Sequence, residues 1–187
     1  LVFTDDQEQF RESIQRFLAD QMPTTKVRQL MATEHGIDSA VWQQASAQLA
    51  LTGIHIPEAF GGAGFGAVEL GIALEEMGGS LFCGPYFSSA VLSAYALMLC
   101  GDEYQQEQWL GDIASGERRA CLAVTEYTGL WQQDDIATTA VTQSSGDVLL
   151  NGKKRFVIDG QSADLFVVAA QSGQGIGLFV VDGRANG

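Results

Sequence analysis

The stretch Ile54–Ala67 reads IHIPEAFGGAGFGA, and its last six residues fit the pattern G-x-G-x-x-G/A. In dinucleotide-binding proteins such glycines let the backbone approach a pyrophosphate at a helix N-terminus. Those proteins also need a strand before the glycines and an acidic residue about twenty positions later. Here Pro57 interrupts the preceding residues, and no acidic residue lies near position 82. We therefore expect a loop that joins two helices, although the helix N-terminus after Gly66 could bind an anion.

The residue types that most often bind metals or act as nucleophiles are few and scattered. The cysteines are Cys83, Cys100 and Cys121, and the histidines are His35 and His55, without the spacing of a zinc site. We therefore expect no metal site and interpret the histidines as structural or surface residues. An odd number of cysteines without a pairing pattern is typical of free thiols in a reducing compartment, so we expect a cytoplasmic protein.

The balance of charge argues against a nucleic-acid partner. The formal net charge is −13 at pH 7 with only ten Lys and Arg residues, whereas binding a phosphate backbone needs clustered cations. The one basic run, Lys153-Lys154-Arg155, is typical of a solvated strand end. No secretory signal pattern is present, and the most apolar segment, Ala90–Cys100, is too short to span a bilayer. We expect neither a nucleic-acid partner nor a membrane span.

The elements that must position any site differ between the two halves of the chain. The first half has helical periodicity, which begins where Thr4 and Gln7 fit a capping box. Pro85 precedes a segment so apolar that we expect it to form a helix in the middle of a bundle. The pattern predicts a helix beginning near residue 4 and further helices over residues 39–49, 67–77, 86–100 and 102–114.

After residue 116 the pattern changes to short β-branched runs separated by Gly, Asp, Ser and Asn. Because no helix lies between the runs, we expect an antiparallel β-sandwich or barrel-like domain. The sequence therefore predicts an α+β protein, with an all-α helical bundle over residues 1–116 and an incomplete β domain over residues 117–187. The expected strands lie within residues 119–126, 136–143, 147–152, 153–160, 164–171 and 177–182.

Four motifs in order along the chain resemble the acyl-CoA dehydrogenase family. PEAFGGAG is similar to that family's P-E-x-Y/F-G-G-x-G region, and LGDIASGE is similar to its L-P-x-I-A-S-G-E helix end. CLAVTE is similar to its x-A-L/V-T-E strand, and LLNGKKRFVIDGQSAD is similar to its L-N-G-x-K-x-F/W hairpin, which ends in G-x-x-A-D. The resemblance covers essentially the whole chain and implies the family's N-terminal helical and middle β domains.

The resemblance implies FAD as cofactor and an acyl-CoA thioester as substrate. In the family a carboxylate removes the α-proton while the β-hydrogen leaves as hydride to the flavin, which requires a dry pocket and donors at the thioester carbonyl. Carried over by position, Val124 and Thr125 would bond the flavin ring and Leu122 would pack against it. Phe156 occupies the aromatic position beside the ring, and Ile158 replaces a common Thr or Ser, so a hydroxyl is lost. The alternative is that all five are ordinary strand residues.

The segment after Glu126 departs from the family pattern. Where P-x-x-G-S-D commonly follows, this chain reads YTGLWQQDD, without the residues that contact the pyrophosphate and the thioester. We expect Trp131, where the loop returns to the sheet, to contact the substrate. We interpret Glu126 as structural and assign no catalytic residue, because the family's catalytic carboxylate lies in a C-terminal helical domain that also builds the oligomer. The chain as given stops before such a domain, as a fragment or a shortened relative would.

The resemblance leaves several functions open. The leading hypothesis is an FAD-dependent acyl-CoA dehydrogenase of lipid metabolism that acts on fatty acyl or steroid side chains. Such an enzyme would form a homo- or hetero-oligomer and could pass electrons to an electron-transfer protein. Alternatives are a flavoenzyme of the same fold with other thioester chemistry, such as hydroxylation or desulfination, and a non-catalytic subunit that stabilises an active homologue. A free-standing binding module is a further alternative.

Overall fold

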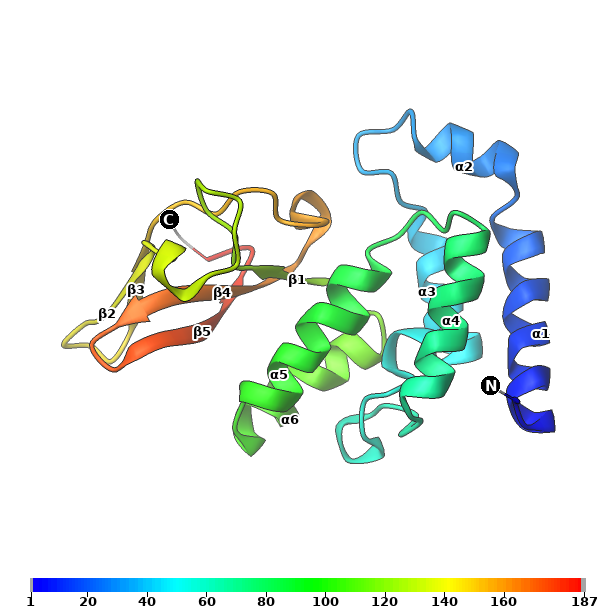
Figure 1. Ribbon diagram of the computed structural model, residues 1–187, viewed down its shortest axis with the longest axis horizontal. Coiled ribbons are helices and arrows are strands. Elements are labelled where there is room, and N and C mark those ends of the chain that lie inside the picture. Colours follow the sequence, from blue (N-terminus) through cyan, green and yellow to red (C-terminus); the bar gives the residue numbers. More distant parts are fainter. Residues whose placement is uncertain (1, 186–187) are drawn as a thin grey trace.

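The computed structural model describes residues 2–185, in which a helical half and a β half follow one another along the long axis of the molecule (Figure 1). Helices α5 and α6 lie between the sheet and the remaining helices. The α-helices and the π-helix are α1 (Asp5–Gln21), α2 (Thr24–Leu30), α3 (Ser39–Leu49), α4 (Ala67–Gly79), the π-helix η3 (Phe87–Ser93), α5 (Ala94–Cys100) and α6 (Glu103–Ala114). Short 3-10 helices are η1 (Leu51–Gly53), η2 (Glu58–Phe60), η4 (Gln133–Asp135) and η5 (Gly160–Ser162). The strands are β1 (Ala120–Ala123), β2 (Thr139–Thr142), β3 (Val148–Asn151), β4 (Leu165–Ser172) and β5 (Gly175–Asp182).

The expected helical half followed by a β half is confirmed, with two differences among the helices. The capping box at the start of α1 is present, since Thr4 Oγ1 accepts from the Gln7 amide and Gln7 Oε1 accepts from the Thr4 amide. Helix α2 was not expected, because it is only seven residues long and buries only Val27. The segment expected as one helix over residues 86–100 is divided into η3 and α5.

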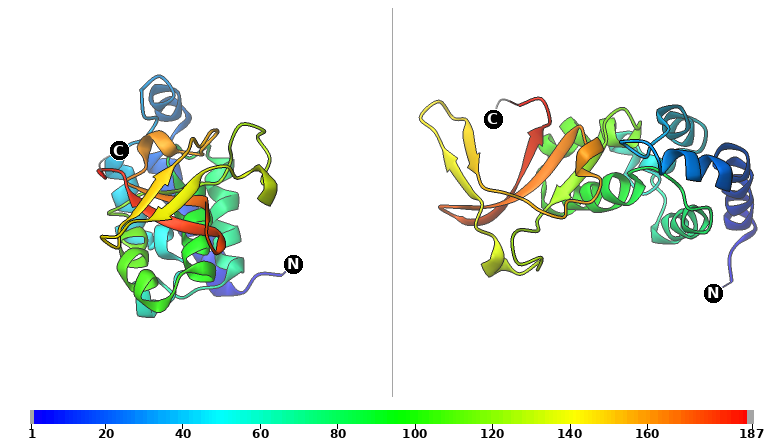
Figure 2. Two further views of the ribbon diagram at one scale, coloured as in Figure 1. Left: turned by 90° about the vertical axis from the view of Figure 1, so that its left-hand side faces the viewer. Right: turned by 90° about the horizontal axis from the view of Figure 1, so that it is seen from above.

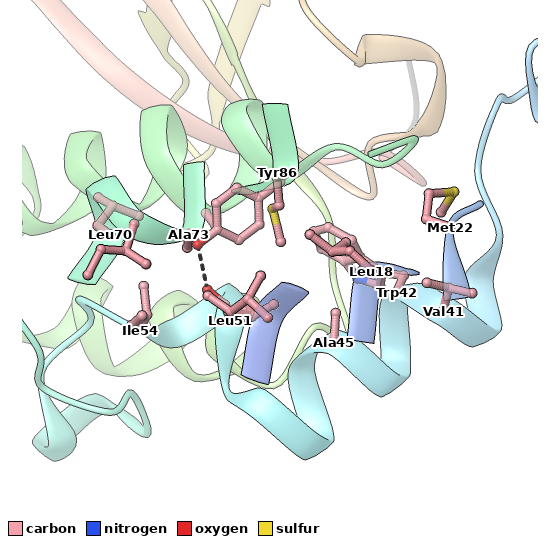
Figure 3. Packing of buried hydrophobic residues seen from close by; sticks show 14 of the residues in the cluster. Leu18, Met22, Val41, Trp42, Ala45, Leu51, Ile54, Leu70, Ala73 and Tyr86 are labelled. Atoms are coloured by element: carbon pink, nitrogen blue, oxygen red, sulfur yellow. Dashed lines mark hydrogen bonds between the residues drawn. The ribbon is translucent and has the colours of Figure 1, made fainter. Parts of the chain in front are cut away.

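The helical core gathers apolar side chains from α1, α3, α4 and the start of η3 (Figure 3). Trp42 of α3 and Leu18 of α1 are almost completely buried within it. The Tyr86 hydroxyl, also buried, donates a hydrogen bond of 2.9 Å to the Leu51 carbonyl oxygen. Pairing this polar group removes the cost of burying it, so Tyr86 ties the beginning of η3 to the core.

The glycine-rich loop is a tight connection between helices, as expected. A Cβ on Gly62 would lie 2.0 Å from the Ile56 carbonyl oxygen, so only glycine fits there. The first turn of α4 carries its own acceptor, because Glu69 Oε2 accepts from the Gly66 amide at 3.0 Å. Glu69 Oε1 accepts from Gln7 Nε2 of α1 at 2.8 Å. This helix terminus is therefore occupied by a carboxylate of the chain itself rather than being open to a phosphate.

The expectation of a purely antiparallel sheet was wrong, because the sheet is mixed. Strands β1 and β2 both pair in parallel with β4, β1 along residues 165–168 and β2 at Gln171. Strand β4 pairs with β5, and β2 pairs with β3, in the antiparallel sense. Long connections without α-helices, over residues 124–138 and 152–164, make the parallel neighbours possible. The expected strand over residues 153–160 is absent, since Phe156 has a φ of 52° and Asp159 has a φ of 56°.

The two halves meet at a short connection around Gly116. The Trp42 indole donates to the Gly116 carbonyl oxygen at 2.9 Å, and Gly116 has a φ of 72°. A Cβ at this position would lie 2.1 Å from Ser46 Oγ, so glycine is required for both conformation and space.

At the opposite end of the β half, the β2–β3 hairpin projects away from the helices (Figure 2). None of the described helices is long and apolar enough to cross a membrane.

A buried carboxylate holds the connection after β1 in place. Glu126 Oε2 accepts from the Ala137 amide at 2.9 Å, and Oε1 accepts from the amide and the hydroxyl of Thr138 at 2.9 and 2.6 Å. Lys154 Nζ lies 2.7 Å from the same Oε1, and each of these two charged side chains is only 9% exposed. Burial alone would raise the pKa of Glu126, but the hydrogen bonds from Lys154, Thr138 and Ala137 outweigh it and lower the pKa to about 2. Glu126 is structural, as interpreted from the sequence.

Lys154 corrects one expectation from the sequence. The basic run was interpreted as a solvated strand end, yet Lys154 is buried between Glu126 and the Val124 carbonyl oxygen, which it contacts at 3.1 Å. Its neighbours Lys153 and Arg155 are exposed. The middle residue of the run therefore holds this segment against the residues that follow β1.

We predict that Glu126→Gln lowers the free energy of unfolding by about 2–4 kcal/mol at pH 7, because an amide cannot accept all four hydrogen bonds and leaves Lys154 unpaired. Since the folded carboxyl has the lower pKa, wild type should lose this contribution as the pH falls from about 4.5 toward 2. Urea denaturation of both proteins between pH 7 and pH 3 should therefore show a difference that shrinks in acid. Glu107→Gln, an exposed change on α6, is the control, and an equal effect of the two substitutions would contradict the prediction.

Candidate functional site

The candidate site lies where the chain leaves β1. The Arg155 amide donates to the Thr125 carbonyl oxygen at 2.8 Å, and Lys154 Nζ bonds the Val124 carbonyl oxygen. Residues 124–126 and 154–156, far apart in the sequence, therefore run side by side. The structure thus brings three of the expected cofactor residues, Val124, Thr125 and Phe156, to one region at the end of β1, and Ile158 follows two residues after Phe156.

Backbone donors remain free at this position. Within residues 2–185 the amides of Val124 and Thr125 have no hydrogen-bond acceptor. The parallel pairing of β1 with β4 ends at Ala123, opposite Val168, so the strand register does not extend to them. The Thr125 hydroxyl also lacks a partner in the described part of the chain, although Thr125 is only 6% exposed. The Thr125 hydroxyl oxygen is not fully buried, so a ligand can reach it. Two free amides beside a reachable hydroxyl suit this edge to bind a ligand with acceptor atoms.

Exposed aromatic side chains flank the free donors. Phe156 is 76% exposed and Ile158 is 44% exposed. The Tyr127 ring is also exposed, and the Arg155 guanidinium carbon lies 5.3 Å from its centroid. Leu122 and Val124 are half-buried, on alternate positions to the buried Ala123. A flat ring system with acceptor atoms on its edge and an apolar face, such as the isoalloxazine of FAD, fits donors and aromatic surface of this kind.

Trp131 does not line the cavity between the helices and the sheet. It is 59% exposed, in the loop over residues 127–135. A cavity of about 870 Å³ lies between α5, α6 and the sheet, with Trp109 and Phe179 in its wall. None of the six residues expected to contact cofactor or substrate lines that cavity. The role expected of Trp131 stays a prediction.

Two hydrogen bonds from η3, to the start of β1 and to the segment after Phe156, were not expected from the sequence. Ser88 Oγ donates to Asp159 Oδ2 at 2.7 Å, and Ser89 Oγ accepts from the Ala120 amide at 3.0 Å. Burial, with a smaller effect from the charge of Asp159, raises the pKa of the Cys121 thiol to about 12, so this cysteine is not a nucleophile at neutral pH. No cluster of three His, Cys, Asp or Glu within the described residues could hold a metal ion.

Comparison with known proteins extends this picture to the whole chain. The family model of the acyl-CoA dehydrogenase N-terminal domain matches residues 4–117, and that of the acyl-CoA dehydrogenase middle domain matches residues 121–187. The mitochondrial long-chain specific acyl-CoA dehydrogenase of Mus musculus is 29% identical over 195 residues, which covers 100% of this chain and 44% of the mouse protein.

Solved structures of other proteins are also similar to this chain. A glutaryl-CoA dehydrogenase from Mycobacterium smegmatis, in complex with FADH2, is 26% identical with a TM-score of 0.87, over 99% of this chain and 47% of that one. The ChsE4–ChsE5 complex from Mycobacterium tuberculosis is 25% identical with a TM-score of 0.85, over 100% of this chain and 49% of the matched one. The chain spans about half the length of the relatives that it matches. Its two matched domains show that the chain belongs to the acyl-CoA dehydrogenase family.

Proposed function

We propose that this chain holds the flavin of an FAD-dependent acyl-CoA dehydrogenase and forms part of its acyl-CoA pocket. The observation that carries the proposal is the pair of unpartnered amides at Val124 and Thr125, with the free Thr125 hydroxyl, beside the exposed ring of Phe156. When bound, FAD would supply the acceptor for the hydride that leaves the β-carbon of the acyl chain. The glutaryl-CoA dehydrogenase relative, a complex with FADH2, supports this choice of cofactor.

Each cofactor residue would have a distinct task. The amides of Val124 and Thr125 and the Thr125 hydroxyl would donate to the edge of the ring, because no partner within residues 2–185 competes for them. Phe156 would cover one face and exclude water, which strengthens the hydrogen bonds at the edge. Leu122 and Ile158 would provide apolar contact.

The base that removes the α-proton would come from elsewhere in the enzyme. Glu126 is the carboxylate next to the site, but four hydrogen bonds already engage it and its low pKa makes it a poor proton acceptor. Asp159 accepts a hydrogen bond from Ser88. We therefore assign the base to a part of the protein beyond this chain, in line with the lengths of the relatives.

The substrate in this proposal is an acyl-CoA thioester with a fatty acyl or steroid side chain, and Trp131 would contact it. The mouse relative is named for long-chain substrates, which supports a fatty acyl group. The ChsE4–ChsE5 structure is a complex of two differently named chains, which supports assembly into a hetero-oligomer as one form. An electron-transfer protein would reoxidise the cofactor.

One observation favours a second function, a non-catalytic subunit that stabilises an active homologue. Ile158 stands where the family commonly has a hydroxyl, and its side chain, which is 44% exposed, cannot donate a hydrogen bond. The loop over residues 127–135 also lacks the family's Ser-Asp pair. A flavoenzyme with hydroxylation or desulfination chemistry would use the same edge and would be recognised by its product.

We predict that the purified chain, mixed with excess FAD and then desalted, retains visible flavin absorption, because the donors at the end of β1 are preformed. The same experiment after mixing with riboflavin tests whether the ring alone suffices. A chain that stays colourless alone and gains flavin only together with a homologue would contradict self-sufficient binding and favour the non-catalytic subunit.

We predict that Thr125→Val weakens FAD binding about five- to tenfold, since it removes one hydrogen bond to the ring worth about 1 kcal/mol. The dissociation constant is measured by titration of flavin fluorescence. Thr142→Val, at an exposed position of β2, is the matched control and should bind FAD like the wild type. Equal affinities of the two variants would place the ring away from Thr125.

A further inference from the structure

The π-helix η3 carries two serines whose hydroxyls form hydrogen bonds with the β half. Ser88 and Ser89 are adjacent and fully buried, yet their hydroxyls bond to different parts of the β half. Ser89 Oγ accepts from the amide of Ala120, the first residue of β1, at 3.0 Å. Ser88 Oγ lies 2.7 Å from Asp159 Oδ2 and 3.2 Å from the Pro85 carbonyl oxygen. One turn of helix therefore contacts both the strand and the segment that flank the free amides. Short π-helical segments are frequent at functional sites.

The segment that bears Phe156 is held in an unfavourable backbone conformation. Phe156 has a φ of 52° and Asp159 has a φ of 56°, in the left-handed region that residues with a Cβ seldom adopt. Such a conformation persists only where surrounding contacts enforce it. The segment is fixed at one end by the bond between the Arg155 amide and the Thr125 carbonyl oxygen. At the other end, the Ser162 amide and hydroxyl donate to the Asp159 carbonyl oxygen, both at 3.0 Å.

Those local bonds shape the turn, but only the side chain of Asp159 connects it to the helical half by a hydrogen bond within the described residues. Without that bond, the turn over residues 156–159 could keep its shape and still shift relative to β1. Ser88 and Ser89 are neighbours in one helix. Their hydrogen bonds therefore hold the turn and the start of β1 at fixed positions relative to the same helix. Tyr86, bonded to the Leu51 carbonyl oxygen, fixes that helix to the core.

We propose that Ser88 and Asp159 are positioning residues, which set the distance between the ring of Phe156 and the free amides of Val124 and Thr125. The inference rests on the proposed function, in that this distance is the width of the slot offered to the flavin ring. Neither residue would contact the reacting atoms. Both would act through Phe156, so their effect would be on cofactor affinity and on the mobility of the segment.

The experiment compares Asp159→Ala with Asp159→Asn in the chain without cofactor. Asparagine keeps an acceptor oxygen for Ser88 Oγ, whereas alanine removes it. Trypsin cleaves after Lys153 and Arg155, which are exposed, and cleavage requires local opening of the segment. We expect cleavage of Asp159→Ala about fivefold faster or more, and cleavage of Asp159→Asn within about twofold of wild type.

Ser88→Ala should match Asp159→Ala, and Ser46→Ala is the control for loss of a buried hydroxyl, since Ser46 bonds Thr52 within the helical half. Equal cleavage of Asp159→Ala, Ser46→Ala and wild type would overturn the proposal. Rapid cleavage of Asp159→Asn would also overturn it, because the acceptor would then be irrelevant. If Ser88→Ala does not fold, the two Asp159 variants decide alone.

Titration with FAD gives a second readout that separates this inference from the proposed function. We expect Asp159→Ala to weaken FAD binding about fivefold while Asp159→Asn retains it. Equal affinity of Asp159→Ala and wild type would overturn the inference even if both bind FAD. Absence of FAD binding by the wild type would refute the proposed function, whereas the cleavage rates would still show whether Ser88 and Asp159 hold the segment.

Discussion

The β half depends on the buried pair of Glu126 and Lys154. Two long connections without α-helices cross this half, and both pass this pair. The carboxylate collects the Ala137 and Thr138 amides from one connection and the Lys154 ammonium from the other. A buried charge with these partners is stable only in one arrangement, because loss of any partner leaves the others desolvated. The pair thereby holds residues 124–126 beside Lys154.

Other Lys and Arg side chains also form ion pairs that link separate parts of the fold. The chain has a net charge of −13 with ten Lys and Arg residues, and five of these side chains pair with carboxylates on other segments of the chain. Arg11 joins α1 to Glu75 and Glu76 of α4, and Arg119 joins the start of β1 to Asp164 before β4. Cations paired in this way link elements of the fold to one another.

In the proposed function, the chemistry would be divided between this chain and a further part of the protein. This chain would provide hydrogen-bond donors and an aromatic wall, which bind and orient, whereas its carboxylates near the site are engaged in structural bonds. Hydrogen-bond donors that orient a flavin ring must be held rigidly. Here they would be held at the end of β1, which packs between the helical core and the mixed sheet. The departures at Ile158 and in the loop over residues 127–135 lie outside that strand, so they could change the affinity or the chemistry without changing the fold.

The sequence by itself determined most of the helices and the α-then-β order. Helix caps such as Thr4 with Gln7, and apolar periodicity, act within a few residues, so they can be recognised locally. The parallel pairing of β1 and β2 with β4, the burial of Lys154 and the bond between Ser88 and Asp159 could not be recognised in this way. Each joins residues far apart in the chain, and each depends on which surfaces the folded halves bring together. Tertiary structure alone decided them, because short patterns carry no record of long-range partners.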